Sequence, residues 1–195
     1  MKKILLSGMV IVSTMAMAQK MKVTSGSFAS LKGIALFDVK FDYSNLKVDK
    51  FKTEEEFLKE KMKKREAKGT DDDFQKSWFA DREERYEPKF VESFNKREPS
   101  IQVGKNNGAP YVMTVKTTWI YPGYNVGAWR QDSKINTTIT VFEKDNPGKV
   151  LLTADYTDVP GNGAFGNDYN SGYRISESYA KLAKELAADV KKGKK

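Results

Sequence analysis

Four aromatic side chains with evident binding chemistry surround the Pro122-Gly123 dipeptide: Trp119, Tyr121, Tyr124 and Trp129. Aromatic rings that are exposed at a strand end or in a loop can stack on sugars or grip a peptide. The structural alternative is that Trp119 and Tyr121 continue the core face of a long strand, while Trp129 packs a corner. The binding hypothesis requires a contiguous exposed aromatic patch.

Carboxylates offer a second chemistry, because two acids held about 5–10 Å apart across a cleft can hydrolyse a glycosidic bond. Candidates for such a pair are Glu83, Glu84, Asp155 and Asp158. Their spacing does not single out one pair, since most acids here stand beside Lys or Arg. A carboxylate-dependent hydrolase acting on an envelope or extracellular polymer is therefore the alternative function.

Residues 161–166 (G-N-G-A-F-G) match the G-x-G-x-x-G pattern of dinucleotide sites, in which glycines let the backbone approach a pyrophosphate. One helix follows the motif, and no second parallel strand is predicted to complete a βαβ unit. We therefore interpret the segment as a Gly/Asn turn between a strand and a helix.

The acidic run Asp71-Asp72-Asp73 offers oxygen ligands that suit calcium. Contiguous acids at a helix start cannot all turn toward one ion, and acids favour the positive end of a helix dipole. The run therefore predicts the beginning of a helix, and no metal site.

Composition excludes several chemistries. The 195 residues contain no His and no Cys, which rules out Ser-His-Asp and Cys-His triads, thiolate or imidazole zinc sites and disulfides. No catalytic motif and no cofactor are expected, which favours a protein that is not an enzyme. The formal net charge is +8, but acids interleave with the basic residues, so we expect no nucleic-acid partner.

Residues 1–18 have the three parts of a secretory signal peptide: Lys2 and Lys3, an apolar stretch, and Ala16-Met17-Ala18 before Gln19. We expect cleavage there and a location in the periplasm or outside the cell. A lipid anchor would require a Cys at the cleavage point, and no later stretch is long and apolar enough to span a bilayer. The predicted organisation is a signal peptide (1–18), a polar lead-in arm (19–33), one α/β domain (34–190) and a basic tail (191–195).

Local patterns place the elements of that domain. Alternation predicts a strand over residues 34–41, a long strand over 111–121 and two more strands around the turn at 145–148. Thr53 and Glu56 form a capping box that opens a helix, and a second helix follows from residue 70 until Pro88 stops it and opens a third. A terminal helix carries one apolar stripe: Ile175, Tyr179, Leu182, Leu186 and Val190.

These elements predict an α+β, two-layer fold in the order β-ααα-β-β-β-β-α. Its sheet should be mainly antiparallel, with about four to five strands, and helices should cover one face, including the C-terminal amphipathic helix.

Several stretches give the chain a resemblance to small exported proteins of Bacteroidetes-type bacteria whose function is unknown: residues 76–82, 87–90, 121–127 and 174–182. The order of elements also looks like the α/β domains of envelope proteins such as the TolB amino-terminal domain and the CsgG-like group. These resemblances imply export and fold, and they supply no catalytic residue.

The sequence thus favours an exported envelope module that binds a partner protein, a polymer or another ligand without catalysis. Its expected contact surface is the long strand with the aromatic segment 119–129. The oligomeric state stays open.

Overall fold

The computed structural model describes residues 20–126, 129–161 and 171–193. A seven-stranded sheet has the order β1-β9-β8-β5-β2-β4, with β3 attached to β5. Its strands are β1 (Lys20–Gly26), β2 (Leu36–Asp42), β3 (Lys47–Val48), β4 (Gln102–Gly104), β5 (Tyr111–Tyr121), β8 (Lys134–Glu143) and β9 (Asn146–Pro160). A separate antiparallel hairpin joins β6 (Tyr124–Val126) to β7 (Trp129–Gln131).

The helices are the 3-10 turn η1 (Phe28–Leu31), α1 (Glu54–Glu66), α2 (Asp71–Asp81), the π-helical turn η2 (Arg82–Tyr86), α3 (Glu87–Arg97) and α4 (Ser171–Gly193). Of the described residues, no helix is both long and apolar enough to cross a membrane. The predicted signal segment 1–18 lies outside the described residues.

The antiparallel unit β5-β8-β9 is confirmed, but the sheet as a whole is mixed and larger than predicted. β2 runs parallel to both β4 and β5, and β3 is also parallel to β5. Three helices separate β2 from its partners, so no turn signal announces these pairings, and β3 and β4 are too short for a visible alternation. The polar segment expected to be a lead-in arm contributes the exposed edge strand β1, which pairs with β9.

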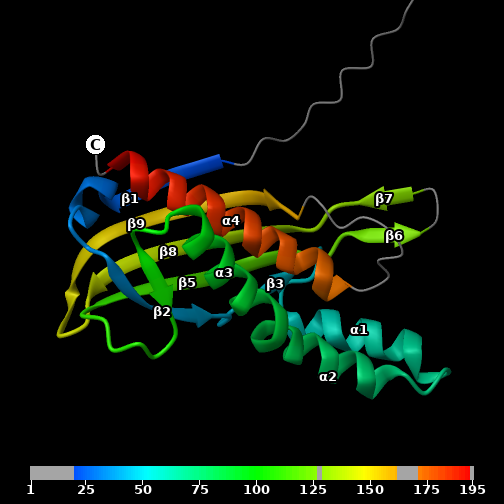
Figure 1. The fold of residues 1–195 in the computed structure, drawn as a ribbon. Coiled ribbons are helices and arrows are strands. Elements are labelled where there is room, and N and C mark those ends of the chain that lie inside the picture. Colours follow the sequence, from blue (N-terminus) through cyan, green and yellow to red (C-terminus); the bar gives the residue numbers. More distant parts are fainter. Residues whose placement is uncertain (1–19, 127–128, 162–170, 194–195) are drawn as a thin grey trace, which may run out of the picture.

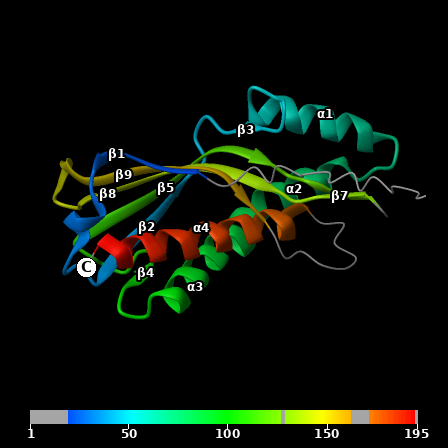
Figure 2. The same ribbon diagram turned by 90° about the horizontal axis from the view of Figure 1, so that it is seen from above.

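α3 and α4 lie side by side over one face of the sheet, as both ribbon views show (Figures 1 and 2). The predicted apolar stripe of α4 is confirmed, since its five members are fully buried. The Thr117 hydroxyl on β5 and the Tyr179 hydroxyl on α4 are 2.6 Å apart, which ties this helix to the sheet. Burial of an apolar helix face against a sheet is the main source of stability in this kind of fold.

The first predicted helix begins as expected. The Glu56 backbone N–H donates to the Thr53 hydroxyl at 3.1 Å, and the Glu56 carboxylate accepts from the Lys52 N–H. The predicted stop at Pro88 is wrong, because the chain passes from α2 through η2 into α3 without leaving a helical path. Proline has no N–H to donate, so the wider π-helical turn just before it accommodates the missing bond.

α1 and α2 project beyond one end of the sheet, at the same end as the β6–β7 hairpin (Figures 1 and 2). α1 contacts β3, and the hairpin continues directly from the end of β5. Segments that are far apart in sequence therefore meet at this end of the molecule, and the candidate site lies there.

Candidate binding site

A β-bulge in β5 decides where the predicted aromatic residues point. The pairing of β5 with β8 shifts register between Thr117 and Trp119. Thr117 and Ile120 are both buried, so Trp119 and Tyr121 no longer alternate onto the core face and lie half-buried on the other side. A bulge adds one residue to one strand and thereby exchanges its two faces.

The rings of Trp119 and Tyr121, which the bulge places away from the core, pack on each other. Trp119 and Tyr121 stack with 6.2 Å between ring centroids and 13° between planes. The indole Nε1 of Trp119 donates to the carbonyl oxygen of Asp49 at 2.9 Å, and the Tyr121 hydroxyl donates to Gln131 Oε1 at 2.6 Å. These bonds fix both rings between the β3–α1 connection and the hairpin.

The other two aromatic residues lie on the β6–β7 hairpin. Tyr124 pairs with Gln131, and Val126 pairs with Trp129. The side chains of these four hairpin residues therefore lie on one face of the hairpin. Tyr124 is 41% exposed and Trp129 is 73% exposed. We call Trp119, Tyr121, Tyr124 and Trp129 the aromatic strip.

Gly123 makes the turn between β5 and the hairpin possible. Its φ of +67° lies in the left-handed region, and a Cβ at this position would overlap the carbonyl oxygen of Gln131. Glycine is the residue that accepts both conditions without strain. The predicted bend at Pro122-Gly123 is therefore confirmed, and the β6–β7 hairpin follows it beyond the end of the sheet (Figure 1).

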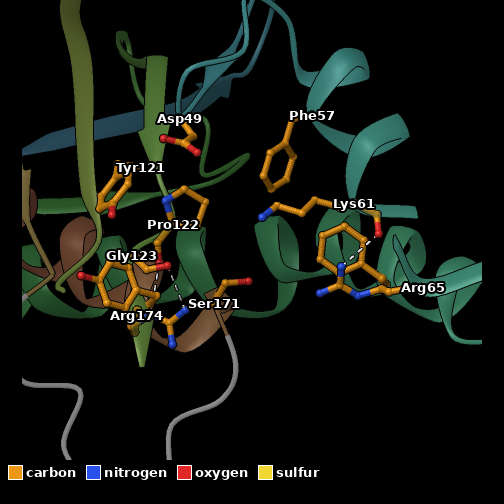
Figure 3. A pocket seen from close by; sticks show the side chains of 11 residues that line it. Asp49, Phe57, Lys61, Arg65, Tyr121, Pro122, Gly123, Ser171 and Arg174 are labelled. Atoms are coloured by element: carbon orange, nitrogen blue, oxygen red, sulfur yellow. Dashed lines mark hydrogen bonds between the residues drawn. The ribbon is translucent and has the colours of Figure 1, made fainter. Parts of the chain in front are cut away.

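Beside the strip lies a cavity of about 270 Å³, between α1, α2, the end of β5 and the start of α4. We call it the Lys61 pocket. Figure 3 shows the Lys61 side chain extending from α1 toward the Tyr121–Gly123 segment. The lining combines aromatic rings, three cations and one carboxylate: Asp49, Phe57, Lys61, Arg65, Phe74, Tyr121, Pro122, Gly123, Tyr124, Ser171 and Arg174.

Two of these cations stand one turn apart on α1, each over an aromatic ring. The Lys61 ammonium is 5.4 Å from the centroid of Phe57, and the Arg65 guanidinium is 4.1 Å from the centroid of Phe74. Arg65 also donates to the carbonyl oxygen of Lys61 at 3.0 Å. Both side chains are half-buried, and neither forms an ion pair with any residue of the described ranges.

The electrostatics of the pocket reflect this excess of positive charge. Burial, together with the charges of Lys64 and Arg65, lowers the pKa of Lys61, and the negative charges of Asp49 and Glu60 only partly offset this shift. A cation whose protonated form is disfavoured in the unliganded protein gains from the arrival of a negative charge.

The third cation has a structural role. Arg174 at the start of α4 is buried, and its Nε donates to the carbonyl oxygen of Pro122 at 3.1 Å. Its Nη2 is 3.5 Å from the carbonyl oxygen of Gly123 (Figure 3). Arg174 therefore fastens the β5–β6 turn to α4 and shapes the floor of the pocket.

A second hollow, of about 470 Å³, lies on the other side of the stacked pair. It is lined by Asn45, Lys47, Thr118, Trp119, Asn136 and Asp158, and we call it the Asn136 hollow. The Asn136 Oδ1 accepts from the Asp158 N–H at 2.8 Å, so its Nδ2 amino group can serve another acceptor. Lys47 is exposed and has no ion pair among the residues that the structure describes.

The candidate carboxylates are dispersed over different elements. Glu83 and Glu84 are exposed on η2, Asp155 accepts from the Thr138 hydroxyl at 2.7 Å, and Asp158 lines the Asn136 hollow. The Lys61 pocket contains a single carboxylate, that of Asp49, whereas a glycosidase requires two. Over the described ranges, no group of three or more acids is arranged to hold a metal ion.

The acidic run lies within the described residues, whereas the glycine motif lies there only in part. Asp71, Asp72 and Asp73 form the first turn of α2, as predicted. Residues 162–166 of the glycine motif lie outside the described residues. Gly161 is buried, and a Cβ there would overlap the Ser133 hydroxyl and the Arg174 carbonyl oxygen, so close packing requires this glycine.

Lys61 and Arg65 are site residues that the sequence patterns did not predict. A signal does exist: Phe57, Lys61 and Arg65 follow each other at a spacing of four and share one helix face. No acid stands three or four positions from either cation, whereas the neighbouring Lys64 pairs with Glu60 at 2.7 Å. A helical cation that lacks an acidic neighbour beside an aromatic residue is a candidate for ligand binding.

No protein-family model matches the chain, and no curated protein matches it. Its structure is similar to that of the PelC dodecamer from Paraburkholderia phytofirmans, with a TM-score of 0.44, 11% identity and coverage of 89% of this chain and 97% of that one. A point variant of the same dodecamer gives a TM-score of 0.33 with 12% identity, over 85% and 97% of the two chains. At this distance the likeness assigns neither a family nor a function to the chain.

Proposed function

We propose that this protein is an exported module of the bacterial cell envelope that binds an anionic ligand at the Lys61 pocket without catalysis. Export is supported by the basic, apolar and Ala-x-Ala parts of residues 1–18. N-terminal sequencing of the exported protein should give a start at Gln19. An exported form that begins at Met1 would contradict the signal-peptide assignment.

The pair Lys61 and Arg65 carries the proposal. Half-buried cations are normally neutralised by a carboxylate, because partial removal from water penalises an isolated charge. These two are held over the rings of Phe57 and Phe74 and have no carboxylate partner among the described residues. An anionic group that enters the pocket supplies the missing partner.

The aromatic strip offers such a ligand ring-stacking contacts in addition to the attraction between charges. Tyr121 and Tyr124 line the pocket opposite α1, and Trp129 extends the same exposed face of the hairpin. Flat rings favour ligands that present a ring face with weakly polar C–H groups. A carboxylate on a sugar ring combines both properties, and we take it as the test ligand.

The test is calorimetric titration of the purified protein with digalacturonate and with the neutral disaccharide cellobiose. We expect digalacturonate to bind at least about tenfold more tightly, and to weaken as salt is added. The double variant Lys61→Gln, Arg65→Gln should lose about tenfold or more in affinity. The matched control Lys59→Gln, Lys63→Gln removes the same charge from exposed positions of α1 outside the pocket and should bind as the parent does.

Thermal melts of all variants establish that folding is retained, because Lys61 and Arg65 also cover aromatic rings. Equal affinity for the two disaccharides, or equal losses in the two double variants, would contradict the proposal.

A further inference from the structure

The Lys61 pocket and the Asn136 hollow share a wall, which is the stacked pair Trp119 and Tyr121. Trp119 lines the hollow and Tyr121 lines the pocket. Asp49 links them as well, because its carbonyl oxygen holds the Trp119 indole while the residue lines the pocket. The two cavities are therefore neighbours along β5, and the residues of this strand that line them, Trp119 and Tyr121, are two positions apart.

We infer that the two cavities are successive subsites for one acidic polysaccharide chain, which crosses the Trp119–Tyr121 stack. This inference rests on the proposed function, since it assumes that the Lys61 pocket takes a carboxylate. It adds the length and the chemical class of the ligand.

The lining of the Asn136 hollow suits sugar hydroxyls. Lys47 and the Nδ2 of Asn136 donate hydrogen bonds, while the Asp158 carboxylate accepts them. A hydroxyl group both donates and accepts, so a polyhydroxylated chain can satisfy this mixture. An acidic peptide or a nucleic acid presents fewer hydroxyl groups, so it offers the Asp158 carboxylate fewer donors than a sugar chain does.

Within the described part of the chain, the two long strands beneath the hollow, β5 and β8, offer no free edge to a peptide. β5 pairs with β8 on one side and with β2 and β3 on the other, and β8 lies between β5 and β9. Peptides that bind sheets usually add a strand at an open edge, where backbone groups are unpaired. A ligand above β5 and β8 therefore meets side chains, which favours the stacking and hydroxyl contacts of a sugar chain.

Two linked subsites make a prediction about chain length. Once one sugar occupies the Lys61 pocket, its neighbours are held close to the second cavity, so their binding becomes intramolecular. A chain that reaches both cavities should bind more tightly than a disaccharide that fills one.

The experiment compares digalacturonate with octagalacturonate on three forms of the protein. The parent should bind the octamer at least about tenfold more tightly than the dimer. Asn136→Asp keeps an acceptor for the Asp158 N–H but replaces the Nδ2 donor by a charge that repels carboxylates. This variant should lose the advantage of the octamer and keep the affinity for the dimer.

Thr140→Asp is the matched control. Thr140 lies on the same face of β8, four residues farther along, outside the hollow, and it is half-buried like Asn136. The same added charge there should leave the octamer advantage intact. Equal losses in the two variants would assign the effect to general repulsion and overturn the inference.

The remaining outcomes separate the two proposals. If digalacturonate binds in a Lys61-dependent manner but octagalacturonate binds no more tightly, the inference of two successive subsites is wrong and the proposed function stands. If neither ligand binds, both are contradicted. If a thymidine octamer or an aspartate octapeptide matches octagalacturonate and shows the same sensitivity to Asn136→Asp, the assignment to a polysaccharide is wrong.

Discussion

The phenol rings of Tyr86 and Tyr179 stack inside the core with 5.2 Å between centroids and 6° between planes, yet their hydroxyl groups differ. The Tyr179 hydroxyl hydrogen-bonds with the Thr117 hydroxyl at 2.6 Å. The Tyr86 hydroxyl is buried and has no hydrogen-bond partner in the described structure. A buried polar group without a partner costs free energy, whereas a partnered one does not.

Removal of the two hydroxyls should therefore have opposite effects on stability. Tyr86→Phe is expected to leave the free energy of unfolding unchanged or to raise it by about 1 kcal/mol. Tyr179→Phe leaves the buried Thr117 hydroxyl without its partner and should lower that free energy by about 1–3 kcal/mol. Urea unfolding measures both. A loss in Tyr86→Phe equal to that in Tyr179→Phe would show that the Tyr86 hydroxyl has a partner after all.

The same tyrosines should limit stability at alkaline pH. Burial raises the pKa of Tyr86 well above 10, and burial also raises the pKa of Tyr179. The unfolded chain loses these protons from about pH 10 upward while the folded chain keeps them, so stability is complete below about pH 10 and declines above it. Unfolding curves between about pH 8 and about pH 11 should show this decline, with a smaller slope in Tyr86→Phe. If Tyr86→Phe loses stability with rising pH as steeply as the parent does, groups other than Tyr86 cause the decline.

Affinity for an acidic ligand should depend on the protonation of Lys61. The pKa of this residue lies below its ordinary value of 10.5, because of burial and of the charges of Lys64 and Arg65. The charged form binds the anion, so affinity should fall as the pH rises through that lowered pKa. Calorimetric titration with digalacturonate at a series of increasing pH values measures this fall in affinity. Lys61→Arg keeps its charge and should shift the fall to higher pH, whereas an identical profile would exclude Lys61 as the titrating group.

Gly161 should prove to be a packing residue. Alanine there would place a Cβ against the Ser133 hydroxyl and the Arg174 carbonyl oxygen, and we expect a loss of about 1–3 kcal/mol in unfolding free energy. The control Gly148→Ala lies near the start of β9, where the nearest atom to a new Cβ is 3.7 Å away, and it should be close to neutral. Full stability in Gly161→Ala would contradict the close approach of β9 to α4.

Trp129 should contribute to binding and little to folding. It is 73% exposed on β7, so Trp129→Ala should change the free energy of unfolding by less than about 0.5 kcal/mol. Loss of one stacking ring should weaken octagalacturonate binding by about 0.5–1.5 kcal/mol. Phe79→Ala removes an aromatic ring of α2 that is 42% exposed and outside the strip, and it should leave binding unchanged. Equal effects of the two substitutions would argue against a specific strip.

Local sequence signals predicted the elements whose pattern is complete within one segment. The capping box of Thr53 and Glu56 marks the start of α1, and the apolar stripe from Ile175 to Val190 marks the buried face of α4. The alternation from Tyr111 onward gives the length of β5. Such signals work because backbone hydrogen bonding and the period of side chains are set by neighbouring residues.

Pairings between distant segments were not predictable in the same way. The parallel contact of β2 with β5 spans three helices, and Pro88 could not reveal that a π-helical turn would accommodate it. Long-range pairing is decided by how whole elements pack, and a short strand such as β3 has no pattern of its own.

For the candidate site, the sequence by itself determined which groups are present: the aromatic residues around Pro122-Gly123, a basic helix, and neither His nor Cys. The tertiary structure decided which way they face and which of them meet. The bulge between Thr117 and Trp119 turned two rings away from the core, because one extra residue exchanges the faces of a strand. Packing of α1 beside β3 then brought Lys61 and Arg65 into one pocket with Tyr121, an arrangement that depends on the three-dimensional path of the chain.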